Sequence, residues 1–517
     1  MKTASNDLYK LIKSLSSHEK RLFKLFAGKD ANSTFYIFLF NKINDAPEYN
    51  EKKLIEQVFK VYKTRNIKQT KKYLYESILT FLEAHYKEYS IDTRLNSYLT
   101  QAEVLRSKNL KEQALKIIVK AEKLAKENYR FLYQSIFQAW KFSLIPRLNN
   151  ESYFKEYLKK EYADELRNAT WQNNTIEIRN LMAQEGLQTG LKPGSEEQQE
   201  LETILQHPLF INKNAYISPL AQIQVYDLKG KIYLKQFNLS GSEKYLEMAC
   251  STIARAIKLV ESTFKDKRAC TELYLLLLWR YTSALMILKK REEVIATHPK
   301  FDAFIESIPE KFRNPYLYEI SIRYKLSLLL YVLAEHEIEE AFQLGKIIQP
   351  LVDKYQYQEA CFFYISYFYV HFYRGDFQQA LRCINKILKD KKTNPRPDIY
   401  DRALVLKLFV YYELKQFYLL PSTCKSTHYH LRKRGKITGL EKALLHLFNK
   451  AATPGLNEKN KQLHLIKTAE EEIQKIVADD SAGINLSLRS WCLLWLKSKR
   501  TNQSLVVLLK EKRSFHA

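Results

Sequence analysis

Glycine and proline are scarce in this sequence. Only 12 glycines and 13 prolines occur among 517 residues, whereas average usage is about 7% and 5%. Chains built from many short strands need these residues at their turns, and no segment alternates apolar and polar residues between such turns. The scarcity therefore argues against an all-β chain, and a hydrophobic content of 46% argues against wholesale disorder.

Paired cysteines and targeting segments are also missing. The six cysteines include no Cys-x-x-Cys pair and lie mostly in apolar helical runs, which is typical of free thiols in a reducing compartment. The first residues, MKTASNDLYKLIKSL, lack the continuous apolar core of a signal peptide. The apolar stretch LYLLLLWRYTSALMIL is interrupted by Arg280. We therefore expect a soluble cytoplasmic protein that does not enter membranes.

The motifs of common active sites are absent as well. The sequence holds no phosphate-binding loop, no dinucleotide fingerprint and no Gly-x-Ser-x-Gly elbow. Cys424 and His428 are four residues apart and could share a helix face, but His430 points elsewhere and a fourth ligand is lacking. Ordinary helix residues explain this group better than a metal does. We expect no catalytic residues, no metal and no cofactor, so the protein is predicted not to be an enzyme.

Helical periodicity runs through almost the whole chain. In residues 1–90, Ser16 and Glu19 form a capping-box pattern before SHEKRLFKLFA, and Leu74 and Ile78 lie on one face of a long helix. This segment is predicted to be a basic N-terminal helical unit.

A second pattern repeats from residue 91 onward. Its best copy is YISYFYVHFYRGDFQQALRCINKIL, in which Gly375 and Asp376 make a turn between two helices and Ala380 is a small residue early in the second. Ala114, Ala341 and Leu420 occupy the corresponding position in weaker copies. Self-similarity with a period near 40 residues predicts stacked helical hairpins, that is, an all-α solenoid.

Segment 361–392 resembles a tetratricopeptide (TPR) repeat. With Gly375 at the turn, it places Tyr364 and Tyr367 on the first helix and Ala380 on the second. Segment 95–126 is similar through Tyr98, Ala102, Ala114 and Ala121. The closing proline is absent and the period exceeds the 34 residues of the family. The resemblance is to the wider TPR-like class, and it implies a fold without naming a function.

The pattern suggests four parts. The basic unit covers 1–90 and the first TPR-like hairpins cover 91–185. A linker or long loop is predicted at 186–200, where three glycines, a proline and three glutamates gather. A C-terminal TPR-like solenoid covers 201–517.

The TPR-like resemblance implies a binding face. In such hairpins the first helix lines a concave surface, and an aromatic groove edged by arginines has the composition of a protein-binding hot spot. We expect this face to expose the residues Arg323, Phe362, Ile365, Tyr369, Phe372 and Arg402. The alternative is that tight winding of the solenoid buries them. If they do face the groove, a partner segment or another part of this chain should cover them.

Positive charge outweighs negative charge, with 83 Lys and Arg against 57 Asp and Glu. Two stretches, 57–75 and 414–440, contain no acidic residue. The first carries Lys63, Arg65, Lys68 and Lys72, close to the start of a helix whose backbone N–H groups favour anions. Nucleic-acid contact is one interpretation, and a solvated charged face is the alternative that we favour.

These observations favour a non-enzymatic scaffold that binds a protein or peptide with the concave face of a TPR-like solenoid. The second hypothesis is a nucleic-acid-associated regulator with a basic N-terminal unit and a TPR-like sensing domain.

Overall fold

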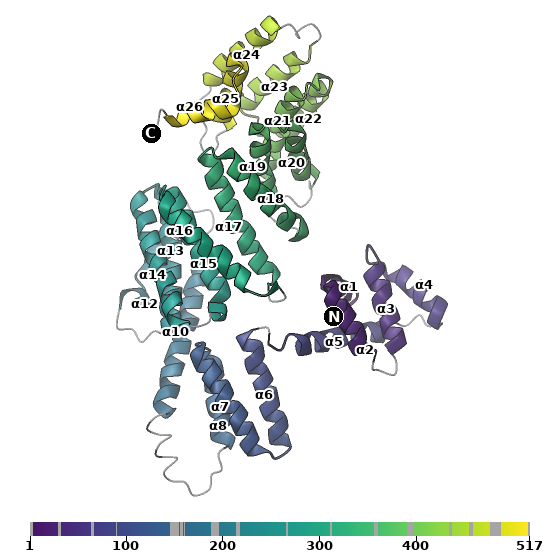
Figure 1. Cartoon of the computed structure of the whole chain (residues 1–517), viewed down its shortest axis with the longest axis vertical. Coiled ribbons are helices and arrows are strands. Elements are labelled where there is room, and N and C mark those ends of the chain that lie inside the picture. Colours follow the sequence, from purple (N-terminus) through teal and green to yellow (C-terminus); the bar gives the residue numbers. More distant parts are fainter. Residues whose placement is uncertain are drawn as a thin grey trace. The chain divides into compact units, whose positions relative to one another are not determined.

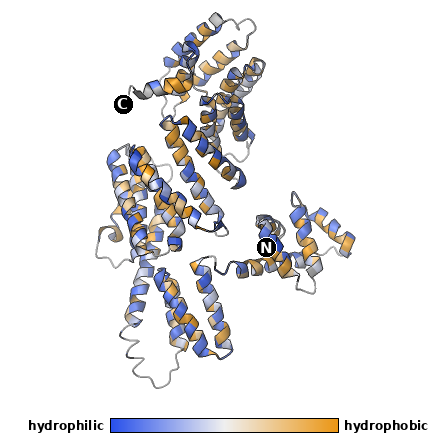
Figure 2. Ribbon diagram, in the orientation of Figure 1, coloured by the Kyte–Doolittle hydropathy of each residue, from blue (hydrophilic) through white to orange (hydrophobic). Residues whose placement is uncertain are grey.

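The described part of the protein consists of helices joined by turns and loops (Figure 1). A computed structural model describes residues 4–514 apart from 29–32, 64–66, 89, 145–154, 156–158, 160, 188–195, 213–217, 265–266, 311–312, 356–359, 390–396, 434–436, 454–458 and 476–487. Apolar and polar residues alternate along most of the helices (Figure 2), as amphipathic packing requires. The all-α prediction is confirmed. Among the helices described, none is long and apolar enough to span a bilayer.

Contacts divide the chain into two compact units. The first unit comprises residues 1–225 and 259–269, and the second comprises 226–258 and 270–517. The predicted boundary at 186–200 falls inside the first unit, and residues 188–195 of it lie outside the described part. The predicted division into four parts stays a prediction.

Five helices of the first unit share one core. Leu8, Phe23, Phe40, Val58 and Ile78 are fully buried there. The capping box forms as expected, with the Ser16 hydroxyl accepting from the Glu19 N–H and the Glu19 carboxylate accepting from the Ser16 N–H. These helices are α1 (Ala4–Ser14), α2 (Ser17–Ala27), α3 (Ser33–Asp45), α4 (Glu51–Tyr62) and α5 (Lys68–His85).

The following helices of the first unit build a second core. Leu95, Ala102, Ala114 and Ile118 are fully buried in it, so the small residues do pack between the helices of a hairpin. This core is formed by α6 (Ile91–Ser107), α7 (Lys111–Glu127) and α8 (Phe131–Leu144), and the first unit continues with α10 (Tyr162–Leu187), α11 (Glu196–Leu205) and α12 (Pro208–Ile211).

The second unit stacks helical hairpins in chain order. Helix α19 packs on its hairpin partner α20 and also on α18 and α21, and the same arrangement recurs along the unit. The solenoid prediction is therefore confirmed. The helices are α13 (Pro219–Ser240) and α14 (Glu243–Thr263), which both units share, then α15 (Thr271–Ile287), α16 (Arg291–Ser307), α17 (Pro315–Ala334), α18 (Ile338–Tyr355), α19 (Ala360–Tyr373), α20 (Phe377–Lys389), α21 (Pro397–Glu413), α22 (Leu420–Lys433), α23 (Gly439–Ala451), α24 (Lys459–Gln474), α25 (Leu488–Thr501) and α26 (Leu505–Ser514).

Five hairpin turns share one backbone device. Gly375 has a positive φ of 78°, its N–H donates to the Phe372 carbonyl, and the next N–H donates to the His371 carbonyl. This pair of bonds is a Schellman motif, which closes the end of a helix. The same pair of bonds occurs at Asn109, Lys289, His336 and Lys415, with φ between 56° and 61°.

The turns fix the register of the repeat. The residue five positions after each turn residue is a buried small or aliphatic side chain: Ala114, Val294, Ala341, Ala380 and Leu420. Four of these five are the positions that the sequence pattern indicated. The predicted repeat register is therefore correct, although only one of the turns contains glycine.

Candidate functional site

Helix α19 is buried on nearly all sides. From Phe363 to Tyr373 every residue is buried, including Ile365 and Tyr369 at 2% exposure and Phe372 at 1%. The expectation that these three side chains are exposed on a groove is wrong. The reason lies more than 100 residues further along the chain, where α25 folds back onto this surface.

Trp491 of α25 covers the aromatic side chains of α19. Its ring centroid lies 5.4 Å from that of Tyr369 and 5.1 Å from that of Phe372, in edge-to-face geometry. Phe409 of α21 contacts the same indole at 4.8 Å. Such aromatic pairs contribute about 0.5–1.5 kcal/mol each beyond their buried area. The chain therefore covers these aromatic side chains itself. Of the two possible covers, a partner segment or another part of this chain, the structure shows the second.

Trp495, one helical turn further along α25, occupies the next part of the groove. Its ring packs edge-on against Phe409 and Tyr412 of α21, with centroids 4.9 and 5.2 Å away, and Phe448 of α23 lies 5.9 Å from it. Helix α25 thus contacts α19, α21 and α23, which are the first helices of three successive hairpins. We call this surface of α19, α21 and α23 the concave groove.

A buried carboxylate fixes the position of α25. The indole N–H of Trp495 donates to Oε1 of Glu413 at 2.6 Å, and the Lys499 ammonium donates to Oε2 at 2.7 Å. The Glu413 side chain is only 9% exposed, and burying a charge requires partners of this kind. At its outer side α25 pairs Arg500 with Glu470 of α24 at 2.9 Å.

Helix α25 is amphipathic and turns its apolar side to the groove. Trp491, Cys492, Trp495 and Leu496 are buried, whereas Lys497 is exposed. Positions i and i+4 lie on one helix face, so the two tryptophans form a pair of anchors. This is the geometry of an amphipathic helix bound in a groove.

Burial dominates the electrostatics of the groove. It raises the pKa of Tyr369 to about 12, against the nearby guanidinium of Arg402, which lowers it. It likewise raises the pKa of Tyr412 to about 12 and that of the Cys492 thiol above its ordinary range. These hydroxyls and this thiol are therefore protonated at neutral pH, and the groove offers no nucleophile of lowered pKa among these groups.

The remaining predicted face residues are half-buried. Phe362, Arg323 and Arg402 keep partial exposure. Arg323 pairs with Glu319 at 2.8 Å and lies 6.0 Å from the ring centroid of Trp279. The arginines therefore belong to a partly exposed edge, while the aromatic centre is closed by α25.

The predicted basic cluster is only partly visible. Lys63, after the end of α4, and Lys68, at the start of α5, are exposed, and Arg65 lies outside the described residues. Lys72 is exposed and approaches the Glu76 carboxylate at 3.7 Å. Lys71, between them, is buried and pairs with Glu51. The stretch is therefore not uniformly a free basic face.

The possible metal ligands do not converge. Cys424 is buried against the Leu445 carbonyl, His428 is exposed, and His430 lies 3.4 Å from Asp401. In the part of the chain that the structure describes, no group of three His, Cys, Asp or Glu side chains is placed to hold a metal ion.

Sequence reasoning missed the residues that close the groove, namely Trp491, Trp495, Glu413 and Lys499. Two signals were available. The tryptophans are four residues apart, which is one helical turn, and α19 has no polar face, which is typical of a helix buried all round.

Comparison with known proteins adds no family. A scan against protein-family models finds no match, and a search of curated proteins finds no significant one. The function is therefore argued from the geometry.

Proposed function

We propose that this protein is a non-enzymatic, cytoplasmic scaffold whose concave groove binds an amphipathic helix of a partner protein. The observation that carries the proposal is the seating of α25, which places two tryptophan anchors across α19, α21 and α23. A surface that holds one such helix has the shape and chemistry to hold another.

The groove has the features of a helix-binding site. Its centre is aromatic, and Glu413 provides one buried acceptor for an indole N–H and an ammonium group. Aromatic anchors in desolvated pockets supply most of the energy of typical interfaces. A partner helix is therefore expected to carry two large aromatic residues at positions i and i+4, followed one turn later by a lysine or arginine.

Because α25 belongs to the same chain, a partner helix has to compete with it. A tethered segment acts at an effective concentration that reaches millimolar values for short flexible linkers. Partner affinity should therefore be low until α25 is weakened. This competition gives the proposal a direct test.

The test uses a labelled peptide with the sequence of residues 488–501. In the full chain, Lys499→Glu places a negative charge beside Glu413 and weakens the seating of α25 on α19, α21 and α23. Fluorescence anisotropy should show the peptide binding to this variant more tightly than to the unaltered chain. Lys497→Glu, which changes the same charge at an exposed position of α25, should have no such effect.

A peptide with alanine in place of both tryptophans is the matched ligand control and should not bind. Equal binding of the two peptides would contradict the proposal, as would failure of the tryptophan peptide to bind a Lys499→Glu variant whose circular dichroism and unfolding midpoint show it to be folded.

A second candidate function is electrostatic nucleic-acid binding by the N-terminal helices. The observation in its favour is that Lys60, Lys63 and Lys68 are exposed and form no ion pair within the described residues. Affinity for duplex DNA should then fall steeply with salt, with a log–log slope of about −0.9 per neutralised phosphate. Lys63→Gln with Lys68→Gln should flatten the slope, and absence of binding at low salt would exclude this function.

A further inference from the structure

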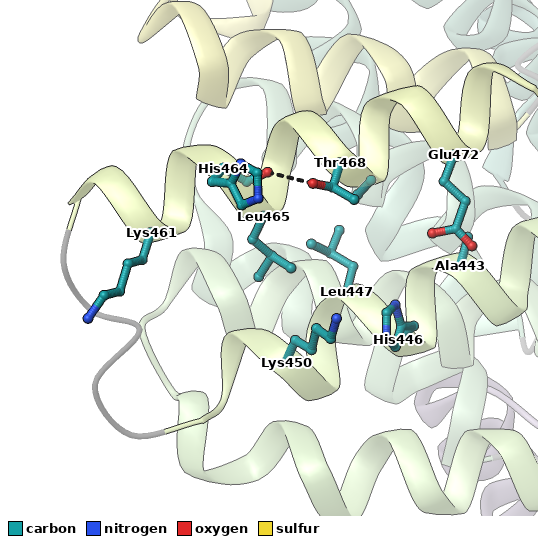
Figure 3. Close-up of a pocket in the computed structure, with 10 residues that line it drawn as sticks. Ala443, His446, Leu447, Lys450, Lys461, His464, Leu465, Thr468 and Glu472 are labelled. Carbon is teal, nitrogen blue, oxygen red and sulfur yellow. Dashed lines mark hydrogen bonds between the residues drawn. The ribbon is translucent and has the colours of Figure 1, made fainter.

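A second groove lies between α23 and α24. It has a volume of about 610 Å³ and is lined by residues of these two helices alone. Figure 3 shows Leu447 and Leu465 pointing toward one another in its middle. Both helices belong to the second unit, so the groove lies within one hairpin of that unit.

The floor of the groove is apolar and its edges are polar. Ala443 and Ala469 are buried small residues, and Leu447 is buried between them. The edges carry His446 and Lys450 from α23 and Lys461, His464, Thr468 and Glu472 from α24.

Charge is unevenly distributed along this groove. Lys461 lies at one end and Glu472 at the other, as Figure 3 shows, with Lys450 and the two imidazoles between them. Lys450 is exposed and places a positive charge on the edge of the groove toward that end. A helix carries partial negative charge at its C-terminus and partial positive charge at its N-terminus. The groove therefore has a polarity that favours one direction of a bound helix.

We propose that the α23–α24 groove binds an acidic amphipathic helix of a partner protein. Leucine-sized side chains of that helix would lie over Leu447 and Leu465, and its acidic C-terminal turn would lie over Lys450. Its N-terminal turn would face Glu472. From residue 461 to residue 472 α24 rises by roughly 16 Å, so about three turns of the partner helix fit.

The probe for this proposal is a fluorescein-labelled synthetic helix with leucines on one face and glutamates on the other. Lys450→Glu in the full chain reverses the charge on the groove edge, and we expect it to weaken binding about fivefold to tenfold. Lys467→Glu makes the same change on α24 at an exposed position that does not line the groove. It should leave the affinity within about twofold of the unaltered chain.

Two further arms separate the groove from other sources of binding. Thr468→Trp fills the groove without changing charge and should abolish binding, with circular dichroism and the unfolding midpoint as checks that the variant is folded. An excess of unlabelled peptide 488–501 should not displace this probe from the unaltered chain, so the outcome does not depend on the concave groove.

Equal weakening by Lys450→Glu and Lys467→Glu would overturn the proposal, because it would show that the probe responds to the net charge of +26 and not to the groove. Equal binding of a helix with lysines in place of the glutamates would overturn it as well.

Discussion

At the residue scale, the turn positions of the hairpins stand out. Left-handed backbone conformation costs a residue with a side chain roughly 1–2 kcal/mol relative to glycine, yet Lys289, His336 and Lys415 adopt it. The two hydrogen bonds of the Schellman motif hold them there. These positions therefore store strain that a substitution can release.

Lys415→Gly should raise the free energy of unfolding of the second unit by about 0.5–1 kcal/mol, because glycine adopts positive φ without strain but loses more entropy on folding. Gly375→Ala should lower it by about 1 kcal/mol. A Cβ at Gly375 meets nothing within 4 Å, so that loss is conformational. Urea unfolding measures both changes.

The control is Lys425→Gly in the interior of α22, where glycine should be destabilising by about 1 kcal/mol. A loss of stability at Lys415→Gly similar to that at Lys425→Gly would show that the turn residue is not strained.

A buried histidine should make the second unit sensitive to acid. Burial lowers the pKa of His371, and Arg374 adds to this, while Asp376 opposes it. The folded protein therefore holds His371 neutral at pH values where the unfolded chain, with a pKa of 6.5, already binds a proton. Stability should be constant above this range and fall as the pH drops below 6.5.

Unfolding in urea at pH 7.5 and at pH 5.5 measures the effect. His371→Gln should reduce the difference between the two pH values, and the two proteins should respond equally to a change from pH 8 to pH 9. An undiminished difference in the variant would assign the acid sensitivity to other groups.

At the element scale, α19 illustrates what the sequence could and could not predict. Helical periodicity and the small residues at Ala341 and Ala380 were enough to predict the hairpins and their register, because both are local properties. The burial of Tyr369 could not be predicted from the register. The register identifies the side of α19 that faces the groove, but it does not say which element covers that side. The covering helix is distant in sequence, and no local pattern encodes a contact of that range.

Tyr369→Ala tests this burial directly. The side chain is 2% exposed and packs on Trp491, so its removal should lower the free energy of unfolding by about 3–5 kcal/mol without any partner present. Thermal unfolding followed by circular dichroism measures the loss. Tyr418→Ala removes the same side chain at a position that is 77% exposed and should change stability by less than about 0.5 kcal/mol.

At the scale of the whole molecule, the two units differ in composition. All six cysteines, at 250, 270, 361, 383, 424 and 492, lie in the second unit. Five of them are buried and only Cys270 is half-buried. Burial raises the pKa of Cys383 and of Cys424 to about 12 and that of Cys250 to about 11, which leaves almost no reactive thiolate at neutral pH.

Thiol labelling should therefore report on the second unit alone. A small aromatic disulfide reagent at pH 7.5 should modify Cys270 first in the folded protein, and all six thiols only in denaturant. Mass spectrometry of the labelled protein identifies the sites. The Cys270→Ser variant should show almost no fast labelling. Rapid reaction of Cys383 or Cys492 would contradict the packing of α20 or α25 against the solenoid.

The return of α25 to the concave groove also bears on how the chain is made. In an ordinary solenoid each hairpin finishes its packing against the neighbour that left the ribosome just before it. Here Tyr369 packs against Trp491, which lies about 120 residues further along the chain. At common rates of translation the ribosome adds those residues in on the order of ten seconds. During that interval the nascent chain exposes tyrosine and phenylalanine rings that α25 later covers. The ribosome-bound protein should be a substrate for chaperones during this window, and slower translation of residues 374–490 would lengthen it.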